Sequence, residues 1–222
     1  MTNDTPSFPS IDLQVRALGC DRGDRPVVRE ISLEAASGQA IQLFGDNGTG
    51  KTTILRALGG LTPIASGAIE WRVDGEECTN AQVSDHRVWL GMGDGLKSAL
   101  SIAENLQYWC GVYGLDREAG RAAQVNVLQR VGLDQITHQR FSTLSAGQKR
   151  RVQLARCLLA RRPIWLLDEP ASALDGSGRA LVASLISEHL GAGGLVILAT
   201  HHKLEIASQN LVLAANDEAQ PQ

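Results

Sequence analysis

The sequence has no long apolar run. No stretch of its 222 residues approaches the roughly 18–20 consecutive apolar residues that a membrane-spanning helix needs. Residues 1–10 are polar, contain two prolines and lack the charged-then-apolar pattern of a signal peptide. We therefore expect a cytoplasmic chain that does not itself cross a bilayer.

The chain also lacks an excess of positive charge and any closely paired cysteines. Its 21 Lys and Arg residues stand against 24 Asp and Glu residues, giving a net charge of −3. No basic stripe is evident, which argues against nucleic acid as the main partner. The four cysteines are scattered, with no C-x-x-C pair and no haem-attachment motif, so the pattern argues against a zinc site and indicates reduced thiols.

A glycine-rich loop is the strongest signal that is present. Residues 45–52 read G-x-x-x-x-G-K-T, the pattern of a phosphate-binding loop. The apolar run at residues 40–44 predicts a buried strand before the loop, and residues 53–58 follow it with helical spacing. A plain glycine-rich turn before a helix is the alternative. The predicted nucleotide-binding residues are Gly45, Asp46, Asn47, Gly48, Thr49, Gly50, Lys51, Thr52 and Thr53.

The residue types in this loop match phosphate chemistry. Glycines let the backbone turn tightly and approach phosphate oxygens closely. The N–H groups of the loop and of the first helical turn then form a cradle for an anion. We expect Lys51 to reach the β- and γ-phosphates of a bound nucleotide and the Thr52 hydroxyl to hold Mg²⁺.

Two further apolar runs end in residues that can do chemistry. Residues 164–167 predict a buried parallel strand that leads into Asp168 and Glu169, and residues 195–199 predict another that leads to His201. Ligands of parallel sheets lie at the carboxyl ends of the strands. We expect Asp168 to hold Mg²⁺ and Glu169 to orient or deprotonate the water that attacks the γ-phosphate. Taken alone, the two acids fit an ordinary strand-end turn, and a strand-end histidine fits a structural role.

The middle of the chain has helical periodicity and is interpreted as an inserted helical subdomain. Ser101 and Glu104 fit a capping box that starts a helix running through residue 109. A second helix is predicted over residues 116–131. Its expected apolar face comprises Leu115, Ala119, Ala122, Val125, Leu128 and Val131. Core packing and a docking surface for membrane subunits are both open interpretations for Leu106, Tyr108, Trp109 and Val112.

The order of these motifs resembles that of ABC-type ATPases. After the phosphate loop come L-S-A-G-Q at residues 144–148, D-E-P at 168–170, S-A-L-D at 172–175 and the strand-end His201. The resemblance implies an α/β P-loop NTPase fold with a RecA-like core, an N-terminal antiparallel β-subdomain and an inserted α-helical subdomain. The expected divisions are residues 1–92 (β-subdomain and first part of the core, with the phosphate loop), 93–145 (helical subdomain) and 146–222 (signature helix and second part of the core).

The resemblance also implies a site shared between two copies. In this family two nucleotide-binding domains close head to tail, and each ATP lies between one phosphate loop and the partner's signature sequence. Ser145, Gly147 and Gln148 are then expected to meet the partner's γ-phosphate. Asp175 would lie in the loop that communicates across the dimer, and His201 would be the switch residue at the γ-phosphate.

Three positions depart from the family pattern. Ala146 replaces the first glycine of the signature and brings a methyl group toward the ligand. Gly93, with Asp94 beside it, stands where a glutamine that binds Mg²⁺ is usual. Arg22 lies where an aromatic side chain usually stacks on adenine, although an arginine plane can stack as well.

A narrower resemblance points to a pathway. The runs G-x-x-x-G-L-K at residues 91–97 and L-S-x-x-E-N-L at 100–106 are similar to the ATP-binding subunit of haem-exporter type transporters in bacterial cytochrome c maturation. This implies an ATPase subunit at the cytoplasmic face of the inner membrane, working as a homodimer with membrane-embedded subunits and using ATP and Mg²⁺. The alternatives are another ABC exporter or importer, a soluble ABC-type ATPase, and a nucleotide-gated binding module without catalysis. The sequence shows no second ATPase domain, coiled-coil insert or basic arm, and Glu169 and His201 argue against lost catalysis.

Overall fold

A computed structural model describes residues 8–91 and 95–213. The chain divides into two compact units. We call the first the sheet unit; it combines Met1–Val88, Arg162–Glu169 and Ala183–Gln222. The second, the helical unit, combines Trp89–Arg161 and Pro170–Val182.

An antiparallel sheet occupies the N-terminal part of the sheet unit, with the strand order β2-β1-β4-β5. Asp74 and Gly75 join β4 to β5 with the positive φ angles, 51° and 81°, that a tight hairpin turn needs. Register shifts between Val15 and Asp21 break the alternation of buried and exposed residues along the first strand. The bounds are β1 (Ile11–Arg22), β2 (Arg25–Ala36), β4 (Ser66–Val73) and β5 (Glu76–Cys78).

A second sheet has the order β6-β7-β8-β3-β9, and its β7–β8, β8–β3 and β3–β9 pairs are parallel. Every residue of β7 and β8 is buried, as the continuous apolar runs predict. The short, mostly exposed β9 was not predicted, because its Q-N-L-V sequence carries no strand signal. The bounds are β3 (Ala40–Phe44), β6 (Arg87–Leu90), β7 (Ile164–Asp168), β8 (Leu195–Ala199) and β9 (Gln209–Val212).

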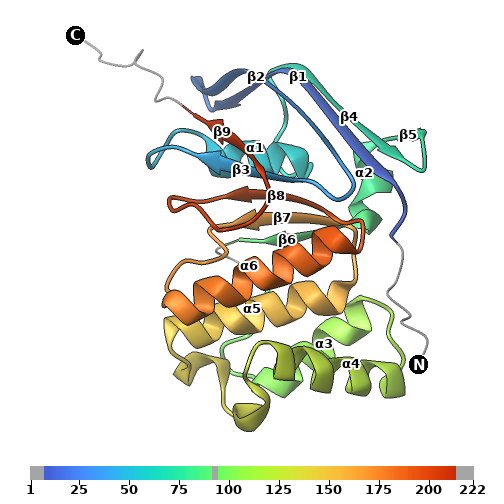
Figure 1. Cartoon of the computed structure of the whole chain (residues 1–222), viewed down its shortest axis with the longest axis vertical. Coiled ribbons are helices and arrows are strands. Elements are labelled where there is room, and N and C mark those ends of the chain that lie inside the picture. The colour runs from blue at the N-terminus through green and yellow to red at the C-terminus, as the bar shows by residue number, and fades with distance from the viewer. Residues whose placement is uncertain (1–7, 92–94, 214–222) are drawn as a thin grey trace. The chain divides into compact units, whose positions relative to one another are not determined.

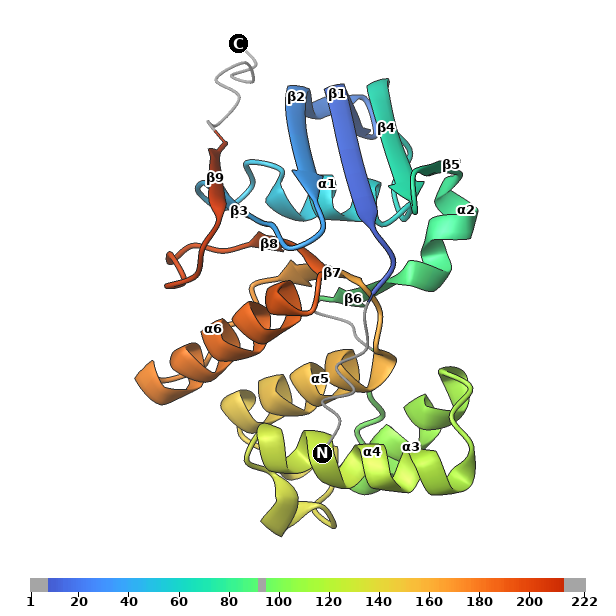
Figure 2. The same cartoon turned by 45° about the vertical axis from the view of Figure 1, so that its right-hand side comes forward.

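Helix α1 (Lys51–Leu58) lies between the two sheets of the sheet unit (Figures 1 and 2). It contacts β7 and β8 on one side and β1 and β2 on the other. Its buried face includes Ile54, Leu55 and Leu58. The helix that follows the phosphate loop is therefore fixed from both sides. The same unit contains the short α2 (Asn80–Val83).

The helical unit is built from α3 (Ile102–Val112), α4 (Arg117–Arg130) and α5 (Ala146–Ala160), which pack against one another in pairs. The Ser101–Glu104 capping box is present. Ala119, Ala122 and Val125 were wrongly placed on the buried face of α4, since all three are exposed, Val125 to 55%. Gln124 is buried instead, and its amide donates a 2.9 Å hydrogen bond to Gln107.

The last long helix, α6 (Gly176–Gly191), begins in the helical unit and ends in the sheet unit. Three 3₁₀ turns complete the described elements: Ser84–His86, Asp134–Ile136 and Phe141–Thr143. Among the residues that the structure describes, no helix is long and apolar enough to span a membrane. The predicted α/β class, with an N-terminal antiparallel sheet followed by a parallel sheet, is confirmed.

Candidate functional site

The phosphate loop joins the end of β3 to the start of α1. Gly45, Gly48 and Gly50 have positive φ angles of 148°, 86° and 95°. A Cβ atom on Gly45 would lie 2.7 Å from the Leu213 carbonyl oxygen, so only glycine fits there. Gly50 is the N-cap of α1 and contributes no capping side chain, which leaves the first-turn N–H groups available to an anion.

Lys51 is buried at the loop, with only 7% of its surface exposed. Its Nζ donates hydrogen bonds of 2.6 and 2.8 Å to the carbonyl oxygens of Gly45 and Asp46. Within residues 8–91 and 95–213, no carboxylate forms an ion pair with it. A buried cation held by neutral dipoles retains its attraction for an anion such as a phosphate. Asp46 and Asn47 are exposed at the tip of the loop, whereas Thr49 is buried.

The Thr52 hydroxyl and the Asp168 carboxylate meet at the same edge of the parallel sheet. Thr52 Oγ1 lies 3.1 Å from Oδ1 and 2.9 Å from Oδ2 of Asp168. Both groups present oxygen atoms, which are the ligands that Mg²⁺ prefers. Asp168 is 7% exposed, and a bound cation would compensate for the burial of its charge. The pair therefore fits a magnesium ion.

Glu169 and His201 lie together at the ends of β7 and β8. Glu169 has a left-handed backbone, with φ at 50°, and its N–H donates to the Ala199 carbonyl oxygen at 2.9 Å. Its Oε1 lies 3.3 Å from His201 Nε2. Among the described residues, this buried oxygen has no partner with hydrogen-bond geometry. The Glu169 side chain as a whole is 28% exposed, so a water molecule can approach the carboxylate and give up a proton to it.

The signature residues lie in the helical unit, where Ser145 is the N-cap of α5. Gln148 N donates to Ser145 Oγ at 3.2 Å, and Ser145 N donates to Gln148 Oε1 at 2.9 Å, which forms a capping box. A Cβ on Gly147 would come within 3.1 Å of the Ala173 carbonyl oxygen. The helix start and the loop before α6 are therefore packed closely together.

Asp175 lies close to the signature residues. The Gly178 N–H and the Ser177 hydroxyl donate to its Oδ1 at 2.7 and 2.8 Å, and these bonds hold the pKa of the Asp175 carboxyl below its ordinary value. Ser145, Gly147, Gln148 and Asp175 line one hollow of about 670 Å³. Arg151 also lines it. Sequence reasoning missed Arg151, although it follows Gln148 by three positions and so lies on the same helix face.

The structure therefore gathers the predicted residues into two groups. The phosphate loop, Asp168, Glu169 and His201 belong to the sheet unit, whereas the signature residues and Asp175 belong to the helical unit. The predictions for Gly93 and Asp94 lie outside the described residues. Arg22 is exposed at the end of β1, where it pairs in register with Arg25.

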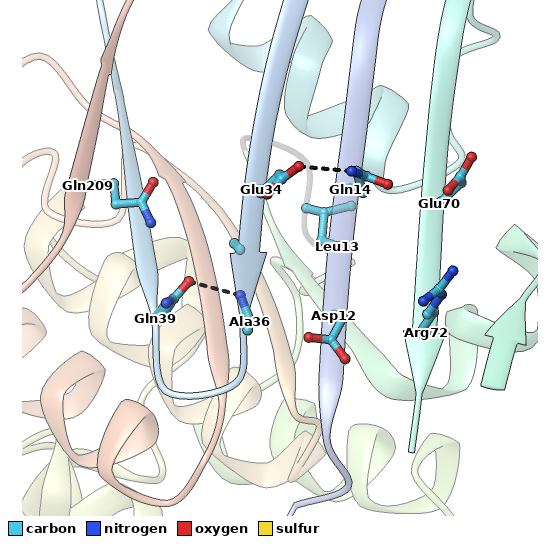
Figure 3. A pocket seen from close by; sticks show the side chains of 10 residues that line it. Asp12, Leu13, Gln14, Glu34, Ala36, Gln39, Glu70, Arg72 and Gln209 are labelled. Atoms are coloured by element: carbon cyan, nitrogen blue, oxygen red, sulfur yellow. Dashed lines mark hydrogen bonds between the residues drawn. The ribbon is translucent and has the colours of Figure 1, made fainter. Parts of the chain in front are cut away.

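A different hollow, of about 530 Å³, lies on the antiparallel sheet and contains none of the predicted site residues (Figure 3). Its polar groups are partly engaged with one another. Gln14 Nε2 donates to Glu34 Oε1 at 2.8 Å, and the Ala36 N–H donates to Gln39 Oε1 at 2.9 Å. We assign no reaction to this hollow.

The family model described as "ABC transporter" matches residues 28–172. The chain is 42% identical over 199 residues to a protein of Nitrobacter winogradskyi named "Cytochrome c biogenesis ATP-binding export protein CcmA", covering 90% of this chain and 96% of the relative. A protein of the same name from Rhodopseudomonas palustris is 44% identical over 206 residues, covering 91% and 98%.

Solved structures agree with this similarity. A putative ABC transporter ATP-binding protein from Pyrococcus furiosus superposes with a TM-score of 0.78 at 27% sequence identity. The match covers 91% of this chain and 97% of that one.

Proposed function

Because this chain belongs to the ABC transporter family, we propose that it is the ATP-hydrolysing subunit of the haem-exporter type transporter used in cytochrome c maturation. It is homologous over about 90% of its length to export proteins that carry the name CcmA. The ATP-hydrolysing role is carried by the meeting of Thr52 with Asp168, and of Glu169 with His201, beside a phosphate loop. The pathway is carried by the similarity to the CcmA proteins.

Each residue of the site in the sheet unit has a separate role in the proposed hydrolysis of ATP. The loop N–H groups and Lys51 would bind the phosphates. Thr52 and Asp168 would hold Mg²⁺, whose charge would offset the negative charge on the phosphate oxygens. Glu169 orients the attacking water and takes its proton. His201, whose Nε2 lies 3.3 Å from Glu169 Oε1, would contact the γ-phosphate beside this carboxylate.

The signature residues act on a second ATP. Ser145, Gly147 and Gln148 line a hollow at the start of α5, where the N–H groups of the first helical turn favour an anion. We propose that this hollow receives the γ-phosphate of the ATP held by a second copy, with Asp175 in the loop between the two. The working form is then a homodimer bound to membrane-embedded subunits at the cytoplasmic face of the bacterial inner membrane. The three-part division at residues 92/93 and 145/146 belongs to the same proposal.

A genetic experiment tests the pathway. Deleting the gene in its own bacterium should abolish covalently bound haem in c-type cytochromes, measured by haem staining of membrane proteins. The wild-type gene should restore the stain, and Glu169→Gln should not. Glu77→Gln changes an exposed acid of β5 and serves as the matched control, which should restore the stain fully. Normal cytochromes in the deletion strain would refute the pathway.

A further inference from the structure

One polar side chain is buried inside β3, an interior strand of the parallel sheet that lies between β8 and β9. Gln42 is the single polar residue of β3, the strand that leads into the phosphate loop, and it is fully buried. A buried amide destabilises the folded state unless each of its polar atoms finds a partner. The hydrogen-bond partners of Gln42 therefore show which part of the chain its side chain fixes in place.

All of these partners lie in the segment that connects β8 to β9. Gln42 Nε2 donates to the Leu204 carbonyl oxygen at 3.2 Å and to Ser208 Oγ at 2.7 Å. Its Oε1 accepts a 3.0 Å hydrogen bond from the Leu204 N–H. One side chain thus holds both backbone groups of a residue that is 162 positions away in the sequence.

The segment between β8 and β9 contains His201 and has no helix or strand hydrogen bonds of its own. Residues 201–208 form neither helix nor strand, and His201, His202 and Lys203 are exposed. At the start of the segment, Thr200 N donates to the Leu43 carbonyl oxygen, and Thr200 Oγ1 bonds both backbone groups of His202. His201 therefore lies between an attachment at Thr200 and an attachment at Gln42.

We propose that Gln42 is a positioning residue for ATP hydrolysis, which holds the His201 segment against the strand that also carries the phosphate loop. Gln42 precedes Gly45 by three residues, so a single strand sets the position of both the loop and the histidine. This inference rests on the role proposed for His201. Its effect should fall on the hydrolysis step, because Gln42 lies inside the sheet and the phosphate loop keeps its own contacts.

Trypsin gives a direct test of the attachment. The peptide bond after Lys203 contains the Leu204 N–H that Gln42 holds, and Leu204 is only 2% exposed. In native full-length protein, Gln42→Leu should raise the rate of cleavage at this bond about tenfold, because proteolysis follows the population of the opened segment. Ser208→Ala removes one hydrogen bond without altering β3 and should raise the rate about threefold. Gln39→Leu, in the turn before β3, is the matched control and should leave it unchanged.

Turnover separates positioning from simple stabilisation. In the transporter complex isolated with its membrane subunits, Gln42→Leu should lower kcat for ATP about tenfold and change KM less than about threefold. The double variant Gln42→Leu/His201→Ala should be no slower than His201→Ala alone, because Gln42 acts through His201.

The outcomes are distinct. Unchanged cleavage after Lys203 in both Gln42→Leu and Ser208→Ala, or additive losses in the double variant, would overturn the positioning role while leaving His201 in the site. Wild-type turnover by His201→Ala would refute the role proposed for His201 and, with it, this inference.

Discussion

Thr52 and Asp168, which are 116 positions apart in the sequence, share two hydrogen-bond contacts of 2.9 and 3.1 Å. The contact joins the first turn of α1 to the end of β7. Nothing in the local sequence of either residue requires the other. The parallel sheet brings them together, because β3 and β7 both pair with β8 and end at the same edge.

The first prediction concerns magnesium. Asp168→Asn removes the negative charge that would hold the ion, so the Mg²⁺ concentration needed for half-maximal ATP hydrolysis should rise about tenfold or more. Nucleotide binding measured with EDTA should change little. Asp12→Asn, which alters an exposed acid on the antiparallel sheet, is the control. An unchanged Mg²⁺ requirement in Asp168→Asn would remove this residue from the metal site.

The second prediction separates chemistry from binding. Glu169→Gln keeps the size of the side chain but cannot accept a proton, so hydrolysis should fall by about 10²–10⁴-fold. Affinity for ATP should remain, and the ATP-bound form should accumulate as a dimer, measured by light scattering. Turnover at the wild-type rate would exclude Glu169 as the base.

The third prediction concerns the buried cation. Lys51→Ala removes a donor that we expect to bind phosphate oxygens, and the loss of a hydrogen bond between charged groups is worth about 1.5–3 kcal/mol, or roughly 10–150-fold in affinity. The measurement is titration with a fluorescent ATP analogue. Arg56→Ala removes a cation from the last turn of the same helix and should not alter the affinity. Equal affinity of Lys51→Ala and wild-type protein would contradict the role of the lysine.

Local patterns were sufficient for the strands that carry the site. The runs at residues 40–44 and 195–199 match β3 and β8, and the run at 164–167 is one residue shorter than β7. These strands are buried on both faces, so their sequences are continuously apolar and easy to recognise. Parallel strands end at the same edge of a sheet, so the residues that follow β7 and β8 were expected to lie close together. Glu169 and His201 do lie together at that edge.

Features that depend on distant partners could not be predicted in this way. Gln124 is buried with its amide bonded to Gln107 on a neighbouring helix, whereas Val125, the next residue of α4, is exposed. Strand β9 exists because β3 pairs with it, as its own sequence is polar. In the sequence, Gln42 is a polar residue within an otherwise apolar strand. Its hydrogen bond with Leu204 explains why it is there. Each of these contacts joins residues that are separated in the sequence, so it can be recognised only once the chain has folded.

The fourth prediction follows from a buried histidine in the sheet unit. His189 stacks on Trp165 with 4.0 Å between ring centroids, and its Nε2 lies 3.0 Å from the Pro163 carbonyl oxygen. Burial lowers the pKa of His189 to about 4, and the hydrogen bond to Pro163 opposes this shift only in part. The folded state therefore keeps the imidazole neutral at pH values where the unfolded chain binds a proton.

The sign of the effect on stability follows from this difference in proton binding. The free energy of unfolding should be highest above about pH 6.5 and should fall as the pH drops toward 4, by up to about 3 kcal/mol from His189 alone. Urea unfolding followed by tryptophan fluorescence at a series of pH values measures this slope. His189→Gln should flatten the slope between pH 6.5 and 4, whereas His138→Gln, which alters an exposed histidine, should not. Equal slopes in His189→Gln and the wild-type protein would show that His189 is not the group that titrates, because no other change distinguishes the two chains.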